Sequence, residues 1–219
     1  MRAYFADILI KEVEDFVPLA GKKVLDVGGA SGIFCKVLSE KRNCTAYNLD
    51  PAPVKYSPCK DEVIWPDTKI GFAEKIPFEC NEFDLVICRA VLEHIPHLKQ
   101  QASIEEIYRV TKKGGLAYIA IPPWYCPFAG HAVRPFHYLP FKYAKALAKL
   151  LYNKNITANS WQEIELFPIS FRKMLRFISK SKFKILATKD THFRMHFLTK
   201  IPLIREITVP SAAFILKKD

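Results

Sequence analysis

Two patterns of apolar and polar positions recur along the chain: short continuous apolar runs, and longer segments with apolar residues three or four apart. The first pattern is typical of buried strands and the second of amphipathic helices. The apolar runs predict strands at 24–27, 45–49, 83–88, 116–121, 183–187 and 212–216, with at most one more at 62–65 in a proline-rich loop. The helical spacing predicts helices at 3–16, 32–40, 101–110, 140–152 and 170–179.

The order of these elements predicts the fold class. Strands and helices alternate from residue 24 to residue 121, which is typical of α/β proteins with helices on both faces of a parallel sheet. Lys112 and Lys113, followed by two glycines, predict the end of the helix at 101–110. We therefore expect one domain, residues 1–219, built on a doubly wound, mostly parallel, Rossmann-like sheet of seven strands. Residues 1–19 are expected to form a helical cap, and residues 123–169 an insert or lid after the fifth strand.

Composition and charge narrow the class of protein and of partner. Half of the residues are hydrophobic and a quarter are charged, as in soluble domains, and no run approaches the roughly 18 apolar residues of a membrane helix. We therefore expect a cytoplasmic protein. The net charge of +11 lies in the last third, because residues 141–219 hold 16 lysines and arginines against five acidic residues. This excess favours an anionic partner, such as nucleic acid or the inner membrane face, and is equally typical of a solvated basic face.

The six cysteines are scattered along the chain and form no C-x-x-C pair. This spacing favours reduced thiols over a disulfide framework or a zinc site. We expect no metal ion.

A glycine-rich turn, D-V-G-G-A-S-G at residues 26–32, follows the first predicted strand. Glycines allow positive φ and let the backbone approach a ligand closely. The turn lacks the G-x-G-x-x-G spacing of dinucleotide sites and the G-x-x-x-x-G-K-[ST] spacing of P-loops. Asp50 ends the second predicted strand, 24 residues beyond Asp26. Both positions fall at the carboxyl ends of strands, where doubly wound sheets bind ligands.

The pattern Asp26-x-Gly28-x-Ala30-x-Gly32 resembles motif I of the class I S-adenosylmethionine-dependent methyltransferases, with alanine at the middle glycine. Four further segments resemble the type 11, or UbiE-like, branch of that family and follow its order. They are G-F-A-E-K-I-P-F at 71–78, F-D-L-V at 83–86, V-L-E-H-I at 91–95 and Y-R-V-T-K-K-G-G at 108–115. The likeness covers roughly residues 20–122, and the tail from residue 170 to 185 resembles the family's last helix and sixth strand.

The resemblance implies an enzyme that uses S-adenosylmethionine as its cofactor and methyl donor. The implied cofactor residues are those of motif I, the acid that accepts the ribose hydroxyls and the loop around the adenine: Asp26, Gly28, Gly29, Ala30, Gly32, Asp50, Ala73 and Glu74. Phe72 stands where the family usually has an aspartate near the adenine amino group, so that hydrogen bond would come from the backbone or from Glu74. Ala30 fits the turn if its φ is negative. Arg89, which ends the fourth strand's apolar run, would orient the cofactor's carboxylate or an anionic acceptor, or form a structural ion pair.

Methyl transfer to a hydroxyl group also requires the loss of a proton, and histidine is the usual base. His131 and His137 lie in G-H-A-V-R-P-F-H-Y-L, residues 130–139, where the insert begins and the acceptor pocket should open. This element resembles one found in methyltransferases encoded among polysaccharide and glycolipid genes. We expect one of the two to be the general base, and the alternative is that both only pin a loop. His94 is expected to anchor a loop, and His97 to be solvated.

The acceptor is expected to be a small molecule, a glycan or a glycolipid precursor that is methylated on oxygen. One alternative is an RNA or protein acceptor on the basic C-terminal third, and another is a non-catalytic relative that acts as a binding subunit. Lysines at 142, 145 and 149 share one face of the predicted helix 140–152, opposite an apolar face that includes Leu151. Such a helix can lie on an anionic membrane surface, or the lysines can be a solvated face.

Overall fold

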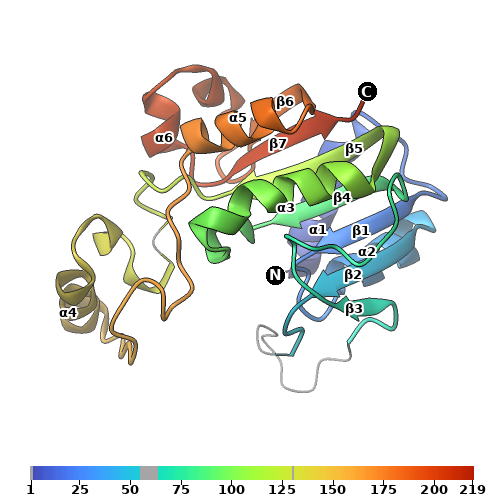
Figure 1. Ribbon diagram of the computed structural model, residues 1–219. Helices are drawn as coiled ribbons and strands as arrows, with labels where there is room; N and C mark the ends of the chain where they lie inside the picture. The colour runs from blue at the N-terminus through green and yellow to red at the C-terminus, as the bar shows by residue number, and fades with distance from the viewer. Residues whose placement is uncertain (1, 55–63, 130) are drawn as a thin grey trace.

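The computed structural model describes residues 2–54, 64–129 and 131–219, and a seven-stranded sheet forms its centre (Figure 1). The strands are β1 (Lys23–Val27), β2 (Thr45–Asp50), β3 (Thr68–Ile70), β4 (Phe83–Arg89), β5 (Thr111–Ile121), β6 (Lys184–Asp190) and β7 (Ala212–Lys217). Their order in the sheet is β3-β2-β1-β4-β5-β7-β6, and β7 alone runs antiparallel to its neighbours. The predicted fold class, a doubly wound and mostly parallel α/β sheet, is confirmed.

Helices cover both faces of the sheet and enclose two apolar clusters (Figure 1). On one face lie α1 (Arg2–Glu14) and α2 (Ile33–Arg42), and on the other α3 (His97–Val110) and α5 (Phe171–Lys180). Leu25 and Val86 face the α3 and α5 side, whereas Val24 and Leu85 face the α1 and α2 side. Successive strand residues thus alternate between the two layers, because side chains along a strand point to opposite faces. Strands buried on both faces explain why their sequences are continuous apolar runs.

The ligand-binding edge of this sheet is set by its strand order. The chain passes from β1 outward to β2 and β3, and then returns to place β4 on the other side of β1. Such a reversal leaves a crevice beyond the carboxyl ends of the strands. Val27 is paired with Leu49 of β2 and with Cys88 of β4, so the ends of three strands meet at this crevice.

Two predicted elements are wrong in position. The third strand is β3 at 68–70, and residues 64–65 form no strand; residues 62–63 of the expected strand lie outside the described part of the chain. The predicted helix 101–110 begins earlier, at His97, and ends at Val110, after which β5 starts at once. Lys112, Lys113 and the two glycines therefore belong to a strand. Gly114 adopts a φ of +74°, and its N–H donates to the Lys218 carbonyl at 2.7 Å.

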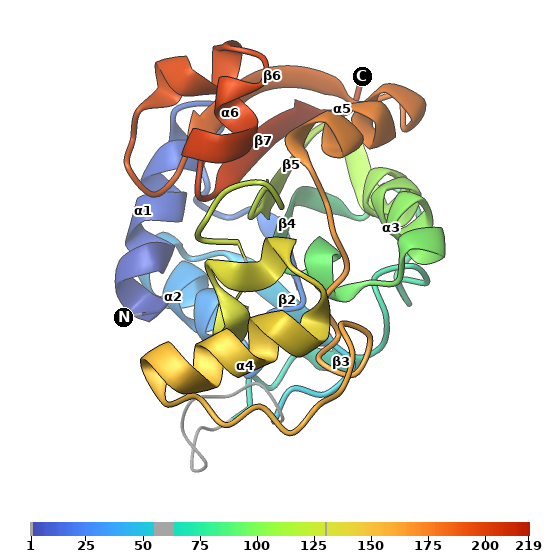
Figure 2. The same ribbon diagram turned by 90° about the vertical axis from the view of Figure 1, so that its left-hand side faces the viewer.

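The segment after β5 holds the short 3₁₀ helices η2 (His131–Val133) and η3 (Phe136–Tyr138), helix α4 (Phe141–Tyr152) and an extended return to α5. Helix α4 lies beyond the carboxyl edge of the sheet (Figures 1 and 2). The connection from β6 to β7 holds η4 (His196–Lys200) and α6 (Ile204–Thr208), and it reaches the same edge because β7 runs antiparallel to β5. Within the described residues, no helix is long and apolar enough to cross a membrane.

Candidate functional site

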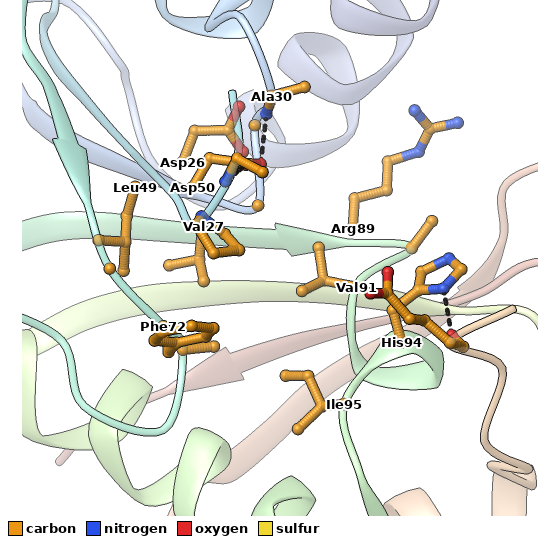
Figure 3. Close-up of a pocket in the computed structure, with 18 of the residues that line it drawn as sticks. Asp26, Val27, Ala30, Leu49, Asp50, Phe72, Arg89, Val91, His94 and Ile95 are labelled. Atoms are coloured by element: carbon orange, nitrogen blue, oxygen red, sulfur yellow. Dashed lines mark hydrogen bonds between the residues drawn. The ribbon is translucent and has the colours of Figure 1, made fainter. Parts of the chain in front are cut away.

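A cavity of about 870 Å³ opens beyond the carboxyl ends of β1, β2 and β4 (Figure 3). It is bounded by the turn after β1, the end of β2, the loop at 71–74, the 3₁₀ helix η1 (Leu92–His94) after β4, and the segment that follows β5. Eight of the residues expected to bind a cofactor line it: Asp26, Gly28, Gly29, Ala30, Asp50, Ala73, Glu74 and Arg89. Gly32 is not among the lining residues.

Glycine is required at both ends of the turn for reasons of packing. Gly28 has a φ of +75°, and a Cβ there would lie 2.3 Å from Val91 Cγ2. Gly32 has a φ of +84°, and a Cβ there would lie 2.4 Å from Trp65 Cβ. Gly32 thus makes room for the tryptophan behind the turn. Ala30 has a φ of +51°, so the condition under which alanine would fit the turn without strain, a negative φ, is not met.

The Asp50 carboxylate joins β2 to the turn. Its Oδ2 accepts a hydrogen bond from the Ala30 N–H at 2.9 Å, and its Oδ1 accepts one from the Ala52 N–H at 2.8 Å. The side chain is buried against the turn yet lines the cavity. A carboxylate oxygen can accept two hydrogen bonds, so each oxygen keeps capacity for one donor from a ligand. Asp50 is therefore oriented by the backbone to bind a pair of neighbouring hydroxyl groups.

The loop that carries Ala73 and Glu74 is held by helix α3. Arg109 donates hydrogen bonds to the carbonyls of Ile76 and Phe78, at 2.8 and 2.9 Å. Glu106 accepts from the Ile76 N–H at 2.8 Å and pairs with Arg109 at 2.7 Å. The hydrogen bond from Arg109 lowers the pKa of Glu106. The loop is thus fixed by a charged pair on its far side.

On the side that faces the cavity, the same loop presents one charged residue, Glu74, and one apolar residue, Phe72. The Glu74 carboxylate forms an ion pair with Lys99 at 2.8 Å. The Phe72 ring lines the cavity and is more than half exposed, and Figure 3 shows it with Leu49 and Ile95 around the apolar end of the cavity. This end suits a flat apolar group such as a nucleobase.

Arg89, at the end of β4, lines the main cavity and a smaller adjoining one of about 200 Å³. Its guanidinium carbon lies 5.9 Å from the centre of the Phe34 ring. In Figure 3 the side chain extends away from Phe72 and Ile95. The arginine is thus placed at the opposite end of the cavity from the apolar slot.

The structure separates the two histidines that were expected to supply a base. His131 lines the cavity, and its Nε2 lies 3.7 Å from Glu93 Oε1. His137 is buried away from the cavity lining; its Nε2 is hydrogen-bonded to the Trp124 carbonyl at 2.7 Å, and its ring packs edge-on against the Trp124 ring. Burial lowers the pKa of His137. His137 therefore pins the segment after β5, and only His131 of the two reaches the cavity.

His94 has a larger place in the site than the sequence indicated. Its Nδ1 donates to the Glu165 carbonyl at 2.7 Å, which is the expected loop anchor (Figure 3). Its ring also lines the cavity and lies 4.9 Å, centre to centre, from the His131 ring. His97 is exposed to solvent, as expected, and its Nδ1 lies 2.8 Å from Lys173 Nζ.

Sequence reasoning missed Glu93 and the return segment. Glu93 is 2% exposed, and neither carboxylate oxygen has a hydrogen-bond partner among the described residues. Gln162, Glu165 and Phe167 line the cavity from the far side of the insert. The Phe167 N–H donates to the Glu93 carbonyl at 2.7 Å and ties that segment to η1. The local signal was an acidic residue within the otherwise largely apolar segment V-L-E-H-I, just after a buried strand.

The cavity as a whole offers acids at Asp26 and Asp50, an apolar slot at Phe72, and two imidazoles at the opposite side. A carboxylate with open acceptor capacity suits a ribose diol, and a second carboxylate suits a cationic amino group. The residues therefore fit a nucleoside that carries a charged amino-acid tail.

Comparisons with known proteins agree with a ligand of this kind. The family model described as a methyltransferase domain matches residues 25–119. An uncharacterised methyltransferase of Mycobacteroides abscessus is 28% identical over 207 residues, which cover 92% of this chain and 78% of that protein. The solved structure of a TehB-like SAM-dependent methyltransferase from Corynebacterium glutamicum matches with a TM-score of 0.62 at 14% identity, over 98% of this chain and 87% of its own. Magnesium protoporphyrin IX methyltransferase from Synechocystis, solved with bound SAM, matches with a TM-score of 0.59 at 13% identity. The match covers 100% of this chain and 80% of that protein's chain.

Proposed function

We propose that the chain, which the family model and the relatives support as a class I S-adenosylmethionine-dependent methyltransferase, methylates a hydroxyl oxygen of a small molecule, glycan or glycolipid precursor. Its cofactor is S-adenosylmethionine, which supplies an activated methyl group on a sulfonium sulfur. The protein's part in such a displacement is to position two reactants and to exclude water.

At the cofactor end, Asp50 would accept the two ribose hydroxyls, since each of its oxygens already holds one backbone donor and has capacity for one more. Asp26, beside the turn, would receive the amino group of the methionine part. Ala73 and Glu74 would border the adenine, with Phe72 packed against it. The ion pair from Glu74 to Lys99 leaves the backbone of this loop as the simpler partner for the adenine amino group.

At the acceptor end, the observation that carries the proposal is that His131 lines the cavity beside His94. Two imidazoles at one wall provide polar contacts for a hydroxyl group, whereas the apolar slot lies at the other end. We therefore propose that the acceptor hydroxyl binds at the wall that His131 forms. The segment after β5 would act as a lid over this end of the cavity.

The exposed residues of α4 favour a glycolipid within the proposed acceptor classes. Leu151, expected on the packed face of the helix, is 59% exposed, and Leu150 is 77% exposed. Lys145, expected on a solvated face, donates instead to the Ala158 carbonyl at 2.7 Å. An RNA acceptor would require cations free to meet phosphates, whereas exposed leucines beside Lys149 suit a lipid surface.

A screen with S-adenosylmethionine labelled on its methyl group would test the proposal. The purified protein is incubated with separate pools of glycolipids, small hydroxylated molecules and RNA, and the labelled product is tested for the base-stable ether that O-methylation forms. We expect label in the glycolipid or small-molecule pool, and none with the Asp50→Ala variant as the control. Label confined to RNA or protein, or to a nitrogen atom of the product, would contradict the proposal.

A further inference from the structure

Glu93, His94 and His131 come together where the cavity meets the segment after β5. We propose that these three side chains bind a divalent transition-metal ion, and that the ion takes the acceptor's hydroxyl oxygen as a further ligand. The metal site stands on the geometry alone; its role toward a hydroxyl acceptor rests on the proposed function.

The three side chains have the spacing and the chemistry of a metal site. One ligand atom from each lies within 4.8 Å of the other two, and His131 Nε2 is 3.7 Å from Glu93 Oε1. Two imidazoles with one carboxylate form the ligand set of several catalytic zinc sites and of non-haem iron sites, both of which keep open positions. The adjacent residues of η1 supply two ligands, and η2 supplies the third from a segment 37 residues later.

Glu93 provides the second, independent observation. The Glu93 side chain is only 2% exposed, and neither of its carboxylate oxygens accepts a hydrogen bond within the described chain. A buried carboxylate without a cation or a donor is costly, by several kcal/mol, so such groups are found paired or bound to metals. The His131 ring is too far away to donate a hydrogen bond, whereas an ion between the two groups would contact both.

The hydrogen bonding of His94 prepares it as a ligand. Its Nδ1 carries a proton, since that atom donates to the Glu165 carbonyl. Nε2 of the neutral ring therefore holds a lone pair. Metal-bound histidines nearly always donate their other nitrogen to a carbonyl or carboxylate in this way, which fixes the tautomer and the ring orientation.

The position of the cluster explains what the ion would do. His94 and His131 both line the main cavity, so the open coordination positions would be accessible to the acceptor. A hydroxyl group bound to a divalent cation loses its proton at a lower pH than in water. The methyl group would pass from the sulfonium sulfur to this oxygen, the electron pair of the broken S–C bond would stay on sulfur, and the hydroxyl proton would leave to water.

Metal binding can be measured without the reaction. Protein freed of metal by a chelator is titrated with Co²⁺, followed by its visible absorption, and with Zn²⁺ by calorimetry. We expect one equivalent of each ion to bind, and His131→Ala and Glu93→Gln to weaken binding by about tenfold or more. His97→Ala, which removes a histidine outside the cluster, should bind as the unchanged protein does.

The outcomes separate the site from the proposed function. Absence of bound Co²⁺ and Zn²⁺, or equal binding by His131→Ala, would overturn the metal site. If Glu93→Gln does not fold, the result for His131→Ala decides whether the metal site exists. The His131 side chain is 40% exposed, and its truncation places no charge in the interior of the protein. Metal binding without methyl transfer to any hydroxyl would contradict the proposed function alone, whereas hydroxyl methylation by a protein that binds no metal would contradict the site alone.

Discussion

Ala30 shows how a single residue stores strain in the cofactor turn. Its φ of +51° is a left-handed conformation that costs an alanine roughly 1 kcal/mol. We predict that Ala30→Gly changes the free energy of unfolding by less than ~1 kcal/mol, because relief of this strain offsets the greater freedom of glycine in the unfolded chain. Ala148→Gly, at a buried position of α4, should cost at least ~1 kcal/mol. Urea unfolding measures both, and equal losses at the two positions would contradict the argument.

Asp50 is the residue on which cofactor affinity should depend most. We predict that Asp50→Asn weakens S-adenosylmethionine binding by about 10- to 100-fold, since hydrogen bonds to a charged group contribute ~1.5–3 kcal/mol. The asparagine oxygen can still accept one of the two backbone hydrogen bonds, so the turn should remain folded. Calorimetric titration measures the change. Asp67→Asn, an exposed acid outside the cavity lining, is the control, and unchanged affinity in Asp50→Asn would remove the ribose assignment.

At the scale of elements, α3 supports the cofactor loop through the Glu106 and Arg109 pair. The pKa of Glu106 is lowered in the folded protein, chiefly by the hydrogen bond from Arg109. The folded form therefore binds this proton less readily than the unfolded form, and the resulting stability is present above the unfolded pKa of about 4.3 and is lost as the pH falls through the folded pKa. We predict that Glu106→Gln lowers the free energy of unfolding by ~1 kcal/mol at pH 7 and by much less at pH 3.

Unfolding by urea at a series of pH values tests this dependence. Glu105→Gln is the matched control, because Glu105 is exposed on the same helix and contacts Gln101 rather than the loop. Its effect should stay small across the whole range. A loss of stability in Glu106→Gln that is the same at pH 7 and pH 3 would show that the carboxylate charge does not hold the loop.

The elements that were predicted well from the sequence are those that are buried on both faces, because burial leaves a continuous apolar run in the sequence. Strands β1, β4 and β7 are buried on both faces, so their apolar runs were sufficient. Strand β3 is half exposed and three residues long, and its pairing with β2 leaves no apolar pattern to detect. The start of β5 was misread because two cations and two glycines usually end a helix, whereas here Gly114 bonds to the backbone beside β7.

The residues of the candidate site likewise fall into those that could be predicted from the sequence and those that could not. Asp50 and the turn at 26–32 are linked by local strand order, and a motif of fixed spacing identified them. Glu93 and His131 are joined only because the segment after β5 folds back over the end of β4. No spacing in the sequence encodes that contact, and His137, equally plausible from its neighbours, is directed into the packing around Trp124 instead.

At the scale of the whole molecule, apolar side chains are exposed on two segments at one edge of the sheet. Helix α4 exposes Leu150, Leu151 and Tyr152, each by more than half, and the segment of η4 and α6 exposes Phe197 and Leu203 in the same way. Both segments face the viewer in Figure 2, on the side where the insert crosses the carboxyl edge of the sheet. Exposed apolar groups on one side of a molecule are typical of an interaction surface. Lys149 and Lys154 flank those of α4, so an anionic lipid surface is the partner of matching chemistry.

This surface predicts that the protein binds vesicles through its leucines as well as its charge. In co-sedimentation we expect binding to vesicles with anionic lipid, weaker binding to neutral ones, and a loss of about tenfold or more when Leu150 and Leu151 are both changed to Ser, since each buried leucine contributes ~1.5–3 kcal/mol. Leu98→Ser is the matched control, because Leu98 is 96% exposed on α3 and outside both segments. Added salt should weaken binding without abolishing it, since screening acts on the lysines and not on apolar burial. Binding that salt abolishes and that the leucine changes leave intact would instead indicate a purely electrostatic partner, and the basic third would then be the surface for RNA.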